Sequence, residues 1–229
     1  MLRQLLFRLR TPHYYKQARR DIPCDCPLCN CPSSGKGKYS FVYICEPRRL
    51  VYFDIPKCAS TSIRMALFQS DNSLSLINPK QKMSHYFKFT FVRNPWDRMV
   101  SNWKMFTTVP FRIVQLKAMI NANMLAFEDF VFFAKRAHNH HWQPQVHFLP
   151  EKLDFVGRVE TFEKDFGELC SKARIGLKTV DKKNAITGLP YWEYYTPSLV
   201  EVVREMYSED IKRFGYRFGE DSFDQKPPQ

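Results

Sequence analysis

The sequence predicts an α/β domain of three layers, in which a central, mainly parallel β-sheet has an antiparallel hairpin at one edge and helices on both faces. Runs of β-branched and aromatic residues alternate along the chain with segments of helical periodicity, the pattern of a parallel sheet connected by helices. The first two runs are separated by only four residues, which predicts a hairpin. Of the 229 residues 44% are hydrophobic and 15% aromatic, which supplies a packed core and excludes a disordered chain.

Four strands are expected in these runs, at residues 39–45, 50–55, 86–92 and 153–159. Helices are expected between and after them, at about 60–69, 96–107, 111–122, 126–137, 160–173 and 197–214. The last helix has the clearest ends, because Thr196 is a good N-cap, Pro197 suits the first helical position and Gly215 stops the helix.

Composition divides the chain into a basic, cysteine-rich appendage and linker at 1–38, an α/β domain at 39–220 and a disordered tail at 221–229. Residues 1–38 contain eight Lys and Arg against two Asp, within a chain of formal net charge +12. Residues 1–10 place leucines at helical spacing beside arginines, so peripheral membrane contact through residues 1–20 stays open beside docking on the domain itself. We expect no transmembrane helix and no signal peptide, because no apolar run approaches the ~18–20 residues of a membrane span.

Cysteines and histidines raise the question of a metal. Three single cysteines lie in apolar or helical contexts typical of buried free thiols, which favours a reducing, cytoplasmic location. A group of four crowded cysteines can form a tetrahedral zinc site, or it can remain a redox pair or free thiols. A group of four crowded histidines lacks the spacing of zinc ligands. Taking both groups together, we predict no metal ligands. The single cysteines are Cys45, Cys58 and Cys170, the crowded ones Cys24, Cys26, Cys29 and Cys31, and the histidines His138, His140, His141 and His147.

The first chemically dense segment follows the strand 50–55. It runs Pro56-Lys57-Cys58-Ala59-Ser60-Thr61-Ser62, a short loop that opens a helix with three hydroxyl residues. Free backbone N–H groups and the helix dipole favour a phosphate there, and Lys57 adds a full positive charge. A G-x-x-x-x-G-K-[ST] loop is absent, which disfavours a nucleoside triphosphatase.

The second dense segment follows the strand 86–92. Arg93 stands at the end of the strand, Pro95 opens a helix, and Arg98 and Ser101 lie three residues apart on one face of it. A guanidinium and a hydroxyl so placed can hold one phosphate from two sides.

These two segments carry a resemblance to a known family. Residues 56–62 resemble the 5′-phosphosulfate loop of sulfotransferases, and Arg93-Asn94-Pro95…Arg98…Ser101 resembles their 3′-phosphate motif R-x-P-x-x-R-x-x-S. The stretches 87–98, 141–145 (His-Trp-Gln-Pro-Gln), 155–160 and 194–197 resemble the carbohydrate branch that includes the chondroitin and human-natural-killer-epitope enzymes and bacterial relatives. The resemblance covers roughly residues 50–218.

The resemblance implies a P-loop-like fold and transfer of the sulfuryl group of 3′-phosphoadenosine 5′-phosphosulfate (PAPS) to an acceptor hydroxyl by in-line displacement. The acceptor is expected to be a carbohydrate, the product is 3′,5′-adenosine bisphosphate (PAP), and no metal is required. Lys57 would stabilise the leaving phosphate, with residues 56–62 around the 5′ end of the donor and Arg93 and Ser101 at its 3′-phosphate.

The sequence departs from the family pattern at one position and leaves the general base open. Ala59 stands where many relatives have glycine, so a positive φ there would cost about 1 kcal/mol. His85 precedes the strand 86–92 and is expected about 20 Å from Arg93, at the wrong end of the sheet. His141, in the H-W-x-P-Q patch, is therefore the predicted base.

Two other functions compete with this interpretation. A nucleic-acid-binding protein could use the basic N-terminus, but it would leave both phosphate motifs unexplained, so no nucleic-acid partner is expected. A small-molecule kinase with an atypical phosphate loop would need Mg²⁺ and an acidic ligand, for which Asp54 is the candidate.

Overall fold

The computed structural model describes residues 42–45, 48–68, 85–110, 112–114, 116, 126–137, 139–176 and 189–220. The appendage at 1–38 with its four crowded cysteines, the tail at 221–229 and most of the predicted helix 111–122 lie outside these residues.

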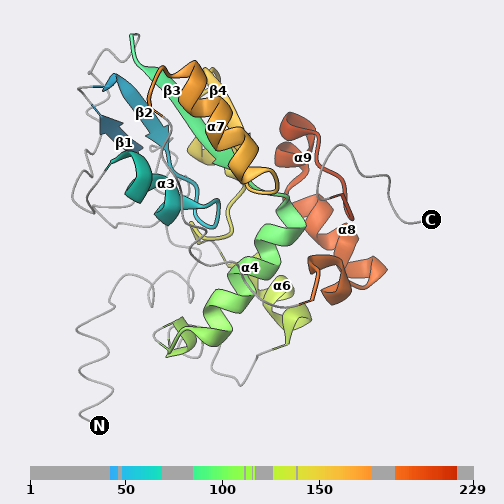
Figure 1. The fold of residues 1–229 in the computed structure, drawn as a ribbon. Helices are drawn as coiled ribbons and strands as arrows, with labels where there is room; N and C mark the ends of the chain where they lie inside the picture. Colours follow the sequence, from blue (N-terminus) through green and yellow to red (C-terminus); the bar gives the residue numbers. More distant parts are fainter. Residues whose placement is uncertain are drawn as a thin grey trace, which may run out of the picture.

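The sheet has the predicted mixed character. Its strands are β1 (Val42–Cys45), β2 (Leu50–Phe53), β3 (Phe87–Val92) and β4 (Phe155–Arg158), arranged in the order β1-β2-β3-β4 (Figure 1). The pair β1–β2 is antiparallel, and β2–β3 and β3–β4 are parallel. The expected hairpin at one edge of a mainly parallel sheet is confirmed.

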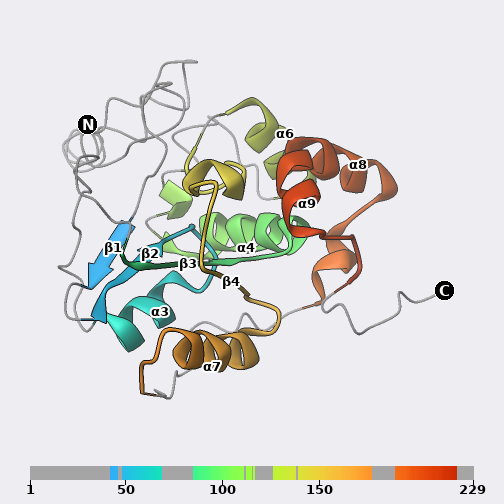
Figure 2. The same ribbon diagram turned by 90° about the horizontal axis from the view of Figure 1, so that it is seen from above.

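Helices cover both faces of the sheet, which gives the three predicted layers (Figure 2). One face carries α3 (Ser60–Leu67) and α7 (Phe162–Lys172). The other carries α4 (Pro95–Thr108), α6 (Phe127–Arg136), α8 (Pro197–Met206) and α9 (Ser208–Phe214). Strand β2 is apolar throughout because it is buried on both faces: Leu50 and Tyr52 pack toward α3, and Val51 and Phe53 toward α4.

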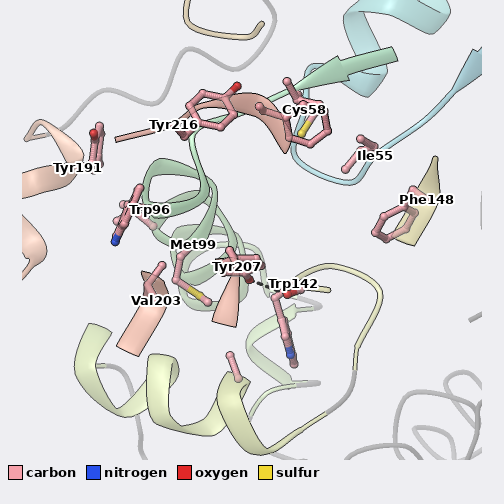
Figure 3. Packing of buried hydrophobic residues seen from close by; sticks show 14 of the residues in the cluster. Ile55, Cys58, Trp96, Met99, Trp142, Phe148, Tyr191, Val203, Tyr207 and Tyr216 are labelled. Carbon is pink, nitrogen blue, oxygen red and sulfur yellow. Dashed lines mark hydrogen bonds between the residues drawn. The ribbon is translucent and has the colours of Figure 1, made fainter. Parts of the chain in front are cut away.

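The single helix predicted at 197–214 is wrong, because the structure has two helices there. Thr196 caps α8 and Gly215, at φ 70°, ends α9, as predicted, but Tyr207 interrupts the helix with φ −119° and ψ 28°. The Tyr207 hydroxyl donates a buried hydrogen bond of 2.6 Å to the carbonyl oxygen of Trp142 (Figure 3). The break turns α9 back over the 3-10 helix η3 (Gln145–Phe148).

The larger core lies between the sheet and α4, α6, α8 and α9. In Figure 3, Met99 of α4 points toward Val203 and Tyr207, and Trp142 lies beyond them. Among the described residues, no helix has both the length and the apolar character that crossing a membrane requires.

Candidate functional site

The loop between β2 and α3 has an unusual backbone. Lys57 and Ala59 both have positive φ, 72° and 60°, and Ala59 has ψ 22°. Neither residue is glycine, so each left-handed conformation carries a cost of about 1–2 kcal/mol. The strain expected at Ala59 is therefore present, and Lys57 adds a second strained position.

The start of α3 offers backbone donors to an anion. The first intrahelical bond runs from the N–H of Ile63 to the Ala59 carbonyl, at 3.1 Å. The N–H groups of Ser60, Thr61 and Ser62 therefore have no acceptor within the helix. Together with the helix dipole they favour negative charge at this point.

The Ser60 hydroxyl is directed into the protein. It forms a very short hydrogen bond with Asp54 and lies 3.1 Å from the carbonyl oxygen of Ile55. Asp54 also accepts from the Tyr52 hydroxyl at 3.2 Å and lies 4.0 Å from the Arg64 guanidinium. Burial raises the pKa of Asp54, and these bonds partly oppose the effect. The Asp54 carboxylate, which a kinase would need to bind Mg²⁺, is thus already engaged by hydrogen bonds and an ion pair within the domain.

Lys57 sits among other cations. Burial lowers its pKa to about 8, assisted by the positive charges of Arg93 and Arg112. The carbonyl oxygen of Lys57 accepts a hydrogen bond of 3.3 Å from Arg93 Nη1. The two segments singled out in the sequence therefore meet directly, at the carboxyl ends of the adjacent strands β2 and β3.

Arg93 and Ser101 line one cavity of about 390 Å³. The Nε of Arg93 donates to Asp97 at 2.7 Å, an ion pair between residues four apart. Ser101 is 1% exposed, and its buried hydroxyl has no hydrogen-bond partner in the described part of the chain. The full lining is Arg93, Asp97, Val100, Ser101, Lys104, Val159, Glu160, Leu189, Pro190, Tyr191 and Trp192.

Arg98, expected on the same helix face as Ser101, does not share the cavity with it. It is fully buried, and it donates to the carbonyl oxygens of Pro56 at 3.0 Å, Gln143 at 2.7 Å and His141 at 3.0 Å. This arginine therefore ties the loop before α3 to the segment that carries the histidines, and it does not line the cavity.

His141 is 6% exposed and held in one orientation. Its Nδ1 lies 2.9 Å from Asn139 Oδ1, which also accepts the His141 backbone N–H. An amide oxygen only accepts, so Nδ1 carries the hydrogen and Nε2 is the acceptor nitrogen of the neutral ring. Burial lowers the pKa of His141 well below its usual value, with the charges of His140, Arg112 and Lys57 adding to the effect. His141 is thus neutral and close enough to Lys57 to sense its charge.

Two other histidines, His140 and His85, have surroundings that differ from those of His141. Burial, with Arg112 and Arg98, lowers the pKa of His140 to about 3. His85 is exposed and precedes β3, so it lies at the end of the strand opposite Arg93, as predicted. Among the described residues no group of three or more His, Cys, Asp or Glu could hold a metal ion.

Residues 41–217 match the protein family described as the Sulfotransferase family. The chain belongs to this family. Two curated proteins to which it is similar are carbohydrate sulfotransferase 11 of Mus musculus and of Rattus norvegicus. Each is 25% identical over 217 residues, covering 80% of this chain and 58% of the relative, so the chain spans less than two thirds of their length. No solved structure matches the chain significantly.

The structure of this sulfotransferase-family chain also assigns a role to Gln145, which sequence reasoning passed over. Its Oε1 accepts from the Arg93 backbone N–H at 2.9 Å and from Cys58 Sγ at 3.3 Å. Its Nε2 donates to the Arg93 carbonyl at 2.8 Å, and the buried Asp210 accepts its backbone N–H. Gln145 thus fixes the loop before α3 relative to the end of β3. Its place in the H-W-x-P-Q patch was the one available signal.

Glu160 is the second residue whose role the sequence did not reveal. It lines the cavity and accepts from the Asn94 backbone N–H at 2.5 Å and the Tyr216 hydroxyl at 3.3 Å. Burial raises its pKa to about 7, although the Asn94 bond and the charge of Arg93 oppose this. In this sulfotransferase-family site a carboxylate near its titration point therefore lies beside the arginine of the second motif.

Proposed function

We propose that the chain is a sulfotransferase that moves the sulfuryl group of PAPS to a hydroxyl of a carbohydrate acceptor. The observation that carries this proposal is the direct contact between two anion sites, made by Arg93 Nη1 and the Lys57 carbonyl. PAPS has a 5′-phosphosulfate and a separate 3′-phosphate, so one donor molecule can occupy both sites. Family membership supports the reaction class, and the similarity to carbohydrate sulfotransferase 11 supports a carbohydrate acceptor.

The donor's 5′ end would lie at residues 56–62. There the backbone N–H groups of Ser60, Thr61 and Ser62 meet the phosphosulfate, and the exposed Thr61 hydroxyl is available to it. Ser60 would contribute through its backbone, because Asp54 engages its hydroxyl. Pro56, Cys58 and Ala59 shape the loop. The 3′-phosphate would occupy the cavity with Arg93 and the unpartnered hydroxyl of Ser101.

Lys57 and His141 would carry the chemistry. In an in-line displacement the acceptor oxygen bonds to sulfur while the bond from sulfur to the bridging phosphate oxygen breaks. Lys57 would stabilise the negative charge that grows on the leaving phosphate. His141 Nε2 would take the acceptor's hydroxyl proton. An anionic donor offsets the cations that depress the pKa of His141, so it makes this histidine a stronger base when bound.

Calorimetric titration of the full chain with PAP, with and without Mg²⁺, tests this function. We expect binding that does not change when Mg²⁺ is removed, followed by sulfate transfer from PAPS to carbohydrate acceptors. Binding of ATP that requires Mg²⁺ would indicate a kinase instead. Preference for an oligonucleotide over PAP would indicate a nucleic-acid-binding protein.

Arg93→Ala provides the residue-level test. It should weaken PAP, which carries a 3′-phosphate, and leave adenosine 5′-monophosphate nearly unchanged. Because an ionic hydrogen bond contributes about 1.5–3 kcal/mol, we expect a loss of about 10- to 100-fold for PAP. An equal loss for both nucleotides would remove Arg93 from the 3′-phosphate site.

A further inference from the structure

We propose that Lys104 is the second cation of the 3′-phosphate site and the residue that makes the cavity select nucleotides carrying that phosphate. This inference rests on the proposed function. Lys104 is not part of the R-x-P-x-x-R-x-x-S pattern, which ends at Ser101.

The geometry places Lys104 with the other groups of the site. Asp97, Ser101 and Lys104 follow each other along α4 at intervals of four and three residues, so they share one face of the helix, and all three line the cavity. Lys104 thus follows Ser101, whose hydroxyl has no partner among the described residues, by one helical turn, and both residues line the same cavity.

An aromatic ring holds the ammonium group in place. Lys104 Nζ lies 5.0 Å from the ring centroid of Tyr194, within the range of a cation–π interaction. The ring itself is packed against Trp103 at 5.3 Å and Phe127 at 6.1 Å between centroids. A lysine held in this way loses less side-chain freedom when it binds a ligand.

The charges of the residues that line the cavity favour this role for Lys104. The ionisable lining groups are two cations, Arg93 and Lys104, and two carboxylates, Asp97 and Glu160. Asp97 already pairs with Arg93 at 2.7 Å, whereas no carboxylate of the described residues lies within 4.0 Å of the Lys104 ammonium. Without Lys104 the lining would retain one cation, Arg93, which already pairs with Asp97. Lys104 is therefore the cation of the lining that no carboxylate of the described residues pairs directly.

Calorimetric titration of the full chain with PAP and with adenosine 5′-monophosphate tests the proposal. Lys104→Gln should weaken PAP by about 10- to 100-fold, the range for a charged hydrogen bond, and change the monophosphate by less than twofold. Lys104→Arg should retain most of the PAP affinity, because it keeps the charge over the Tyr194 ring. Lys164→Gln, the same change on the exposed side of α7 in the opposite layer, is the control and should leave both affinities unaltered.

Tyr194 gives a second test that keeps the Lys104 side chain. Tyr194→Leu should weaken PAP selectively because it removes the ring face, while Tyr194→Phe should not. Equal losses for both nucleotides in Lys104→Gln, or no loss of PAP affinity, would overturn the assignment of Lys104. If the unaltered chain fails to bind PAP, the proposed function itself is wrong, so the two failures can be told apart.

Discussion

Replacing Lys57 with alanine should lower the turnover of the sulfuryl transfer far more than it lowers the affinity for the donor. Lys57 lies in a strained loop at φ 72°, and alanine also has a Cβ, so the backbone strain is similar before and after the change. The perturbation is therefore confined to the loss of the ammonium group and its stem.

The expected magnitudes follow from the neighbours of Lys57. Burial lowers the pKa of Lys57 to about 8, and the nearby charges of Arg93 and Arg112 add to the effect. These arginines remain to attract the donor when the lysine is gone, as do the N–H groups at the start of α3. We expect a loss of donor affinity of no more than about tenfold, or about 1.4 kcal/mol. The leaving phosphate, however, gains charge only in the transition state, and removing one such stabiliser costs about 10²–10³ in rate, or about 3–4 kcal/mol.

The assay measures turnover with PAPS and the dissociation constant of PAP for each variant. Lys57→Arg should restore turnover poorly, because a planar guanidinium does not present a point charge at the same place. Lys164→Ala on the far layer serves as the matched control. Turnover of Lys57→Ala within a few-fold of the unaltered chain, or affinity and turnover falling together, would refute the role given to Lys57.

Three further predictions concern pH and the backbone. PAP binding should tighten by up to about tenfold as the pH falls from 9 to 6.5, because Lys57 (pKa about 8) gains its positive charge and Glu160 (pKa about 7) loses its negative charge. When the affinity is measured by calorimetry against pH, Glu160→Gln should flatten the low-pH part of the profile. Ala59→Gly should raise the thermal midpoint by about 2–4 °C, because it relieves about 1 kcal/mol of strain at φ 60°; a fall in a melting experiment would contradict this. Gly157→Ala should destabilise the fold by about 1–3 kcal/mol in denaturant unfolding, because the new Cβ would lie 2.5 Å from the Phe91 ring, while Gly176→Ala, with nothing within 4 Å, should cost far less.

The fold could be predicted from local sequence because its signals are local. Alternating β-branched and aromatic runs, a four-residue hairpin connection and capping residues such as Thr196 and Gly215 each act over a few residues. The structure confirms all of them. The interruption at Tyr207 escaped prediction, because no glycine or proline marks it and the hydrogen-bond partner of the Tyr207 hydroxyl, Trp142, is 65 residues away in the chain.

The sequence also determined which two segments carry the candidate chemistry, since a loop that opens a helix with hydroxyl residues, and an arginine at a strand end, are visible as motifs. It could not decide which of their side chains are available to a ligand. Arg98 is part of the second motif, yet three backbone carbonyls engage it, and the Ser60 hydroxyl belongs to Asp54. Only tertiary packing brings Gln145, Glu160 and Lys104 to the site, because burial, charge balance and hydrogen-bond partners depend on residues that are distant along the chain and adjacent in space.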